Sequence, residues 1–275
     1  LRADKCQFFL QEVRYLGRLV SKNGHRPDPE DTKALEKFRQ PPKNVGELRT
    51  LLGFLGYYRS YVRDFAKKCK PLYDLLKSKG KEKEETVKKK PPKDKKKKQL
   101  DSRKDILWLP EYQVIVNEIV DYLKSPDFLA FPDYNIPFSV HCDASQQGLG
   151  AVLYQKQDGK DKVISFASRS LTDPEKNYNL HSGKLEFLAL KWCVTERFAD
   201  HLCYGPPFTV YTDNNPLTYV MSSAKLNAAG LRWVADLANY QFSIKYKPGK
   251  RHGDADGLSR WTGDMDVLEK ECTSE

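Results

Sequence analysis

The chain has 275 residues and carries 47 Lys and Arg against 37 Asp and Glu, which gives a formal net charge of +10. Its 39% hydrophobic and 31% charged residues are compatible with a globular protein, and its length suggests one or two domains. No apolar run approaches the roughly 18 residues of a membrane span, which excludes a transmembrane protein, and we expect no membrane partner. Leu1 does not open a signal peptide, so we expect the chain to begin inside a longer one.

The cysteines are scattered along the chain and form no Cys-x-x-Cys pair or tight Cys/His spacing. This pattern argues against a zinc site or a disulfide framework and favours a reducing, intracellular compartment. The six positions are Cys6, Cys69, Cys142, Cys193, Cys203 and Cys272.

Nearly all of the excess positive charge lies in residues 77–104, which contain 14 basic and 5 acidic residues. This segment has almost no apolar side chains, so we expect a disordered linker between folded parts of about 76 and about 160 residues. It is either a solvated spacer or a flexible tether for phosphate groups. The tether would place its lysine run, Lys95, Lys96, Lys97 and Lys98, against nucleic acid.

Before this segment, residues 5–21 alternate β-prone and polar side chains, which predicts a short hairpin. A helix is expected from the Asp28 cap and Pro29 to the proline pair that follows residue 40. A second helix begins at Asn44, which with Glu47 resembles a capping box, and its apolar stripe continues to about residue 65. Near its end, tyrosines alternate with Arg59 and Arg63, a pattern found in packed helices and in surfaces that bind a nucleic-acid backbone.

After the segment, a helix is predicted over 112–123, then strands over 138–145, 148–154 and 162–168, with a hairpin at 157–159. A helix over 183–198, a strand over 208–213, a helix over 226–240, a strand over 241–247 and a short helix over 254–261 follow. This order predicts a mixed sheet, in which an antiparallel meander is followed by parallel strands with helical crossovers.

Carboxylates stand at informative places in this plan. Asp143 and Asp213 fall at strand ends, Glu186 lies on the long helix, and Asp254 or Asp256 lies on the closing helix. Each alone has an ordinary interpretation, as turn chemistry, a surface residue or a helix N-terminal acid. Together they form an oxygen-rich set that favours Mg²⁺ or Mn²⁺, and two such ions can support phosphodiester cleavage.

The motifs HCDASQQGLGAVLYQ (141–155), VYTDNNPLTYV (210–220) and DADGLSR (254–260) resemble the RNase H domain of Ty3/gypsy-type retrotransposon Pol polyproteins, particularly those of vertebrate elements. FFLQEVRYLGRLVSKNG and LRTLLGFLGYYRSYVRDFA resemble the end of the reverse transcriptase palm and its thumb. The expected divisions are a palm and thumb remnant (1–76), the Lys-rich linker (77–104), a helical connection (105–136), the RNase H domain (137–261) and a tail leading towards integrase (262–275).

The resemblance implies an α/β, RNase H-like fold, with a mixed five-stranded sheet flanked by helices and a small, mainly helical thumb remnant before it. It implies a ribonuclease H that cleaves the RNA strand of RNA–DNA hybrids, with Asp143, Glu186, Asp213 and Asp256 as catalytic ligands of two Mg²⁺ or Mn²⁺ ions. Expected partners are the hybrid and, in the parent polyprotein, integrase and the missing fingers and palm. The expected location is a cytoplasmic particle or the nucleus. Expected nucleic-acid contacts are Ser145, Asn214, Arg59, Arg63 and the lysine run.

Departures from the family pattern qualify this expectation. The chain has no Asp-Asp pair, which reverse transcriptases need, so polymerase activity is not expected. Asn214 stands where many relatives have His, and His252 is expected to be a surface residue and no proton shuttle. The alternatives are a non-catalytic nucleic-acid-binding remnant, a co-opted retrotransposon-derived protein and an integrase-like member of the fold, against which the position of Glu186 argues.

Overall fold

The structure, a computed structural model, describes residues 8–77, 101–124, 128–146, 148–177, 182–222 and 226–247. The elements up to residue 124 are β1 (Glu12–Tyr15), β2 (Arg18–Ser21), β3 (Gly24–Pro27), α1 (Pro29–Lys33), the 3₁₀-helix η2 (Ala34–Arg39), α2 (Val45–Tyr57), α3 (Phe65–Asp74) and α4 (Pro110–Lys124). The later elements are β4 (Phe138–Ala144), β5 (Gly148–Gln157), β6 (Lys160–Ser170), α5 (Asp173–Asn177), α6 (Ser182–Trp192), the π-helix η3 (Cys193–Arg197), α7 (Ala199–Leu202), β7 (Phe208–Thr212), the 3₁₀-helix η4 (Asn215–Ser222), α8 (Ala228–Leu237) and β8 (Phe242–Tyr246). None of the helices in these ranges is long and apolar enough to cross a membrane.

The first strands form a three-stranded antiparallel sheet, where the sequence predicted a hairpin. The added strand, β3, has few β-prone residues, but it pairs with β2 and is joined to Leu129 by a bridge at His25. The pairing of β3 therefore depends on contacts distant in sequence. The helix predicted from Pro29 is a short α-helix that tightens into η2.

The predicted capping box at Asn44 is confirmed. The backbone N–H of Glu47 donates to Asn44 Oδ1 at 2.9 Å, and Glu47 Oε2 accepts from the backbone N–H of Lys43 at 2.7 Å. The helix ends at Tyr57, however, and does not run to residue 65. Asp64, with a left-handed φ of 51°, precedes a separate helix, α3.

The later strands form one five-stranded sheet in the order β6-β5-β4-β7-β8. β4, β5 and β6 are an antiparallel meander, and β7 and β8 extend the sheet in parallel from β4. The predicted mixed sheet and its fold class are therefore confirmed. At the predicted β5–β6 hairpin, Asp158 (φ 54°) and Gly159 (φ 77°) supply the two positive φ angles that a tight turn needs.

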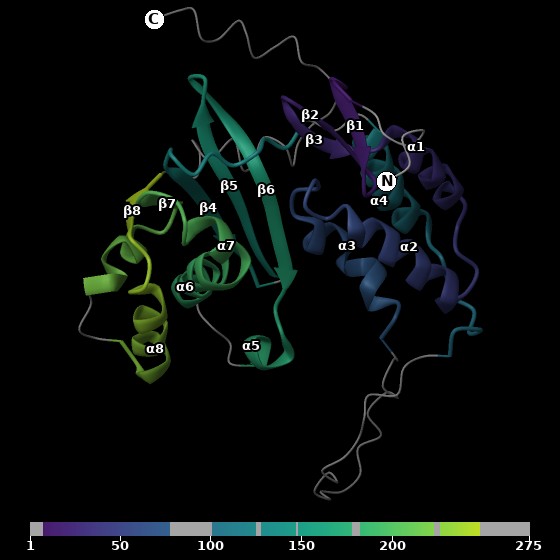
Figure 1. Ribbon diagram of the computed structural model, residues 1–275. Coiled ribbons are helices and arrows are strands. Elements are labelled where there is room, and N and C mark those ends of the chain that lie inside the picture. Colours follow the sequence, from purple (N-terminus) through teal and green to yellow (C-terminus); the bar gives the residue numbers. More distant parts are fainter. Residues whose placement is uncertain are drawn as a thin grey trace, which may run out of the picture.

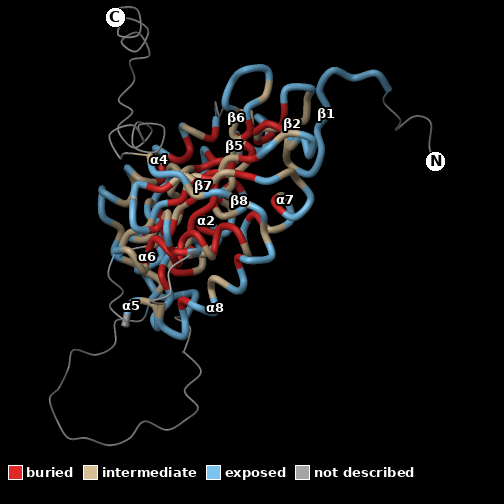
Figure 2. The backbone as a smooth tube through the Cα atoms, turned by 90° about the vertical axis from the view of Figure 1, so that its left-hand side faces the viewer, coloured by how far each residue is buried: buried red, intermediate tan, exposed pale blue. Residues whose placement is uncertain are grey.

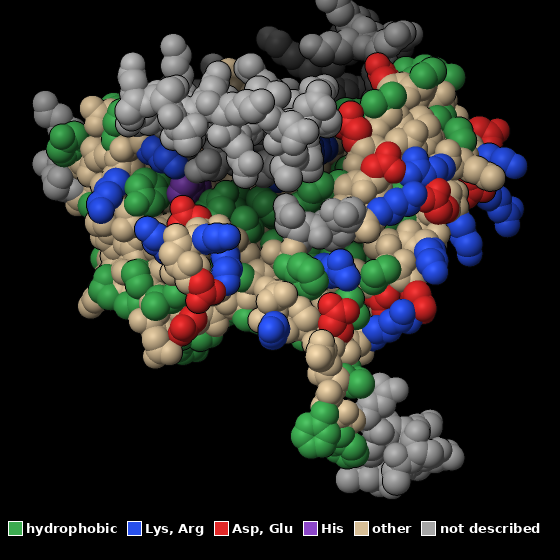
Figure 3. Space-filling model, turned by 90° about the horizontal axis from the view of Figure 1, so that it is seen from above, with side chains coloured by type: hydrophobic (Ala, Val, Ile, Leu, Met, Phe, Trp, Pro, Cys, Tyr) green, Lys and Arg blue, Asp and Glu red, His purple; other side chains and the backbone are tan. Residues whose placement is uncertain are grey.

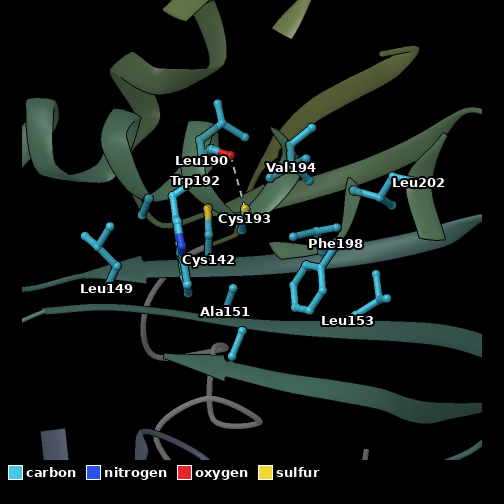
Figure 4. Packing of buried hydrophobic residues seen from close by; sticks show 14 of the residues in the cluster. Cys142, Leu149, Ala151, Leu153, Leu190, Trp192, Cys193, Val194, Phe198 and Leu202 are labelled. Atoms are coloured by element: carbon cyan, nitrogen blue, oxygen red, sulfur yellow. Dashed lines mark hydrogen bonds between the residues drawn. The ribbon is translucent and has the colours of Figure 1, made fainter. Parts of the chain in front are cut away.

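One face of this sheet packs against α6 and the segment after it. Leu149, Ala151 and Leu153 of β5 point towards Leu190 and Phe198, which are all buried (Figure 4). The helix predicted over 183–198 becomes a π-helix at residue 193. Cys193 Sγ donates to the carbonyl oxygen of Leu190 at 3.2 Å near this transition. Burial of both α6 faces makes this helix the centre of the core.

Residues 8–77 and 101–124 form the N-terminal unit, which lies beside β6 (Figure 1). Its core includes Val152 of β5 and Phe166 of β6, so it shares buried surface with the sheet (Figure 2). The N–H of Phe166 donates to the carbonyl oxygen of Ser60 at 3.1 Å. The N-terminal unit thus covers the edge strand, whose backbone groups would otherwise be open to another chain.

Helix α4 follows the Lys-rich segment in sequence but packs in the core of the N-terminal unit. Its residues Val116, Ile119 and Val120 are buried in the same cluster as those of α2 and α3. An isolated β-bridge between Asn44 and Asp105 holds the chain that follows the Lys-rich segment against the start of α2. Residues 101–124 therefore belong to the same unit as residues 8–77, whereas the sequence suggested that the folded part after the Lys-rich segment is separate from the part before it.

Candidate active site

The parallel pairing of β4 and β7 positions the two aspartates. The register pairs Ser139 with Thr209 and His141 with Tyr211. Two residues further along, Asp143 near the end of β4 and Asp213 directly after β7 should therefore direct their side chains to the same side as His141 and Tyr211. Both residues are exposed. The sequence prediction that they lie together at the carboxyl ends of two strands is consistent with this register.

Glu186 reaches the same place from α6. Glu186 is 6% exposed, and its Oε2 has no hydrogen-bond partner among the described residues. Burial, followed by the negative charges of Asp143 and Asp213, raises the pKa of Glu186 to about 8. The backbone N–H of Ala144 acts in the opposite direction. At neutral pH, and with no cation bound, this carboxyl is therefore mostly protonated.

Asp143 has a raised pKa for similar reasons. Although the residue is exposed as a whole, desolvation of its carboxylate by the surrounding protein makes the largest contribution, the charge of Asp213 comes next, and the charge of Asp64 follows. Lys67 lowers the pKa of Asp143. Asp64 and Lys67 belong to the N-terminal unit and lie close to the site, although nothing in the sequence pattern placed them there.

The carboxylates are arranged as neighbours and not as a finished set of metal ligands. Within the described ranges, no group of three His, Cys, Asp or Glu residues is placed to hold a metal ion. Asp256 lies outside the described residues, as do His252 and the lysine run of 95–98. The unpartnered, buried Oε2 of Glu186 and the hard oxygen chemistry of the three described carboxylates nevertheless fit a divalent cation such as Mg²⁺.

The predicted nucleic-acid contacts occupy different places. Ser145 closes the β4–β5 turn, where its N–H donates to the carbonyl oxygen of Gly148 at 2.9 Å. Asn214 follows Asp213, and its buried Oδ1 has no partner in the described chain. Arg59 donates to the carbonyl oxygen of Ser168 at 2.5 Å, and Arg63 lies 3.5 Å from Asp64. The structure thus brings Ser145 and Asn214 near the carboxylates and places Arg59 at the junction with β6.

A groove of about 990 Å³ runs between α6, η4 and α8 and includes Asn214 in its wall. Its basic side chains are partly neutralised, because Arg169 pairs with Glu175 and Lys191 pairs with Glu196. On the face seen in Figure 3, Lys and Arg side chains are interspersed with Asp and Glu in the coloured area. The folded surface on view therefore shows no single field of positive charge.

Comparison with known proteins places this site in a family. Residues 133–240 match the model of the RNase H-like domain found in reverse transcriptase. The chain is 34% identical over 258 residues to the Pol polyprotein of transposon opus and 32% identical over 274 residues to that of transposon gypsy, both from Drosophila melanogaster. The chain belongs to the Ty3/gypsy-type Pol polyproteins. These matches cover 94% and 99% of this chain but 24% of each polyprotein, so the chain spans about a quarter of their length.

Solved structures support the fold of this Ty3/gypsy-type chain. A foamy viral protease-reverse transcriptase in complex with RNA/DNA hybrid matches with a TM-score of 0.65 and 21% identity, over 86% of this chain and 29% of that one. The foamy viral protease-reverse transcriptase dRH in complex with double-stranded DNA also gives 0.65, with 20% identity, over 92% of this chain and 38% of that one. The RNase H-like fold is therefore shared with these foamy viral structures.

Proposed function

We propose that this chain is a divalent-cation-dependent ribonuclease H, which hydrolyses the RNA strand of RNA–DNA hybrids. The observation that carries the proposal is the buried Glu186, whose Oε2 is unpartnered and whose charge is opposed by Asp143 and Asp213. The ionised forms of Glu186 and Asp143 are disfavoured by desolvation and by the charge of Asp213, so a cation that neutralises these carboxylates would stabilise the site. Asp256, in the DADGLSR motif, is proposed as the fourth member.

Each described residue has a distinct part in this proposal. Asp143, near the end of β4, and Asp213, after β7, would offer exposed carboxylate oxygens to divalent cations. Glu186 would ionise when a cation binds and would hold that cation from the buried side. When bound, two Mg²⁺ ions would lower the pKa of a water molecule and stabilise a departing oxygen.

The proposed substrate rests on similarity to proteins with known complexes. A foamy viral relative of this fold was solved with an RNA/DNA hybrid. Ser145 and Asn214, which lie beside the carboxylates, are the described residues that we propose to contact the hybrid. Arg59 and Arg63 stay proposals of the same kind, as do Lys95, Lys96, Lys97 and Lys98. Integrase and the remaining parts of reverse transcriptase are proposed partners in a parent polyprotein.

A cleavage assay on the full chain tests the proposal. A hybrid with a fluorescent label on its RNA strand is incubated with the protein in Mg²⁺ or Mn²⁺. We expect nicks in the RNA strand and a fall of at least about 100-fold in rate for Asp143→Asn and for Glu186→Gln. Asp158→Asn, in the remote β5–β6 turn, is a matched control that should keep the wild-type rate. An intact hybrid in both metal ions would overturn the proposal.

The alternative is a non-catalytic nucleic-acid-binding remnant. It is favoured by the lack, within the described ranges, of three side chains placed to hold one metal ion. This alternative predicts that the protein binds the hybrid, leaves it intact and binds equally well after Asp143→Asn. The same assay, followed by gel shift, therefore decides between the two functions.

A further inference from the structure

Asp64 of the N-terminal unit occupies a position on the sheet beside Asp143. In the β4–β5 ladder Asp143 is paired with Gly150. A Cβ atom at Gly150 would lie 3.0 Å from Asp64 Oδ1. Paired residues of neighbouring strands direct their side chains to the same face, with Cβ atoms about 4.5–5.5 Å apart. The Asp64 carboxylate thus lies over the glycine, close to where a side chain opposite Asp143 would be.

The local structure at Asp64 is consistent with this placement. Asp64 precedes α3 at the N-cap position, where an Asp side chain usually accepts a backbone N–H of the first helical turn. In the described structure its side chain makes no such capping bond, and its backbone is left-handed with φ 51°. The carboxylate is directed to the sheet, with Arg63 Nε at 3.5 Å from its Oδ2.

Lys67, one turn further along α3, carries the opposite charge near the same site. Asp64 raises the pKa of Asp143, whereas Lys67 lowers it. Of the charges that shift the pKa of Asp143, the N-terminal unit therefore supplies one negative charge, Asp64, and one positive charge, Lys67. Changing either residue should alter the site in a direction set by the sign of its charge.

The buried side of the site provides an independent observation that fits a cation. Glu186 is 6% exposed, and its Oε2 has no partner in the described part of the chain. A buried oxygen without a hydrogen-bond partner destabilises the folded chain, and a cation bound at this place would remove that destabilisation. The proximity of Asp64 to Asp143 thus concerns a site whose carboxylates fit a divalent cation.

We infer that Asp64 is a positioning residue of the cation site, whose charge over Gly150 strengthens the binding of divalent cations to the RNase H-like domain. Lys67 opposes it, so the N-terminal unit sets the cation affinity of a site formed by a different part of the chain. This inference rests on the proposed function. It assigns Asp64 an effect through its charge and does not require direct contact with an ion.

Cation binding by the full chain tests the inference without reference to cleavage. Free Mn²⁺ is measured by electron paramagnetic resonance as the protein is titrated, and Mg²⁺ is followed by calorimetry. Asp64→Asn keeps the shape of the side chain and tolerates a left-handed backbone. We expect it to raise the Mn²⁺ Kd roughly threefold to tenfold. This is the size of the Coulomb interaction expected between one unit charge and a divalent ion that are separated by partly solvated protein.

Two further variants separate a charge effect from a structural one. Lys67→Gln should lower the Mn²⁺ Kd by a similar factor, because it removes an opposing charge. Asp158→Asn is the matched control, since Asp158 also has a left-handed φ, of 54°, and a basic partner, Lys162. It lies eight residues along β5 from Gly150, which is about 26 Å at 3.3 Å per residue, and it should leave the Kd unchanged.

The outcomes keep the inference and the proposed function apart. Equal Kd values for the wild type, Asp64→Asn and Lys67→Gln, with hybrid cleavage retained, would overturn the inference and leave the ribonuclease proposal standing. A shift of the Mn²⁺ Kd in the same direction for both variants would also overturn it. The two variants remove charges of opposite sign, so a charge effect must shift the Kd in opposite directions. A wild-type protein that neither binds Mn²⁺ nor cleaves the hybrid would overturn the proposed function and the inference together.

Discussion

The hydroxyl of Ser168 on β6 accepts a hydrogen bond from the backbone N–H of Ala66 on α3 at 2.9 Å, where Ser168 is buried and Ala66 is half-buried. This bond joins the N-terminal unit to the edge of the five-stranded sheet. Arg59 donates to the carbonyl oxygen of the same serine. Ser168 therefore connects two parts of the chain that are about 100 residues apart in sequence.

Ser168→Ala should lower the free energy of unfolding by about 1–3 kcal/mol, because the Ala66 N–H loses its partner in a half-buried place. Ser243→Ala, at an exposed position on β8, is the control and should change stability by less than about 0.5 kcal/mol. Urea unfolding followed by circular dichroism measures both. Equal midpoints for the two variants would contradict the proposed importance of this junction.

Glu186→Gln should change how stability depends on pH. Glu186 has a pKa of about 8 in the folded chain, above its ordinary value of 4.5, so the folded state binds more protons than the unfolded state between these values. Stability should therefore fall as pH rises through this window. The variant cannot ionise, and we expect it to be more stable than the wild type by roughly 1–3 kcal/mol at pH 9 in a metal-free buffer.

Thermal unfolding at pH 5, 7 and 9 measures this difference. Glu118→Gln, at an exposed position on α4, should follow the wild-type profile. Addition of Mg²⁺ should reduce the advantage of Glu186→Gln, since a bound cation favours the ionised glutamate. If the wild type and Glu186→Gln showed parallel pH profiles, Glu186 would not be held in its protonated form.

Gly148→Ala should destabilise the sheet by about 1–3 kcal/mol, because crowding in a packed region forces the backbone to move. A Cβ at this position would lie 2.5 Å from the carbonyl oxygen of Arg169 on the neighbouring strand. Gly53→Ala is the matched control, since a Cβ there has open space within α2. It should stabilise the protein by about 0.5–1 kcal/mol. Denaturant midpoints moving in the same direction for both variants would count against this explanation.

Asn44→Ala should remove the cap of α2 and lower the free energy of unfolding by about 1 kcal/mol. The capping bond that is lost is the one from the Glu47 N–H to Asn44 Oδ1, and the bond from Asn44 Nδ2 to Glu47 Oε1 is lost with it. Asn227→Ala removes the equivalent cap of α8, where Gly230 N–H donates to Asn227 Oδ1 at 2.9 Å. Calorimetry should show similar losses in the free energy of unfolding for both variants. If each variant changed the unfolding of its own part alone, the N-terminal unit for Asn44→Ala and the RNase H-like domain for Asn227→Ala, the two parts would unfold separately.

Local chemistry made several features predictable from the sequence. The cap at Asn44 and the turn at Asp158 and Gly159 depend on side chains and φ preferences within a few residues. The strand alternation around Asp143 follows from one buried face, and so does its place near the end of β4. These features need no information from distant parts of the chain.

Other features depend on contacts between distant residues and could not be predicted. The apolar pattern of α2 continues past Tyr57, so it gave no sign of the break at Asp64 or of the separate helix α3. β3 forms because its backbone pairs with β2 and, at His25, with Leu129. The placement of Asp64 over Gly150 is visible only when the N-terminal unit docks on the sheet.

The packing of α4 has a consequence for the continuity of the polypeptide. Residues on both sides of 78–100 share one core, and the Asn44–Asp105 bridge secures the returning chain against the start of α2. A single cut within 78–100 would thus leave two pieces that are held together without a covalent link. Residues 1–77 and 101–275, produced as separate polypeptides, are therefore suited to assemble by complementation into the same molecule.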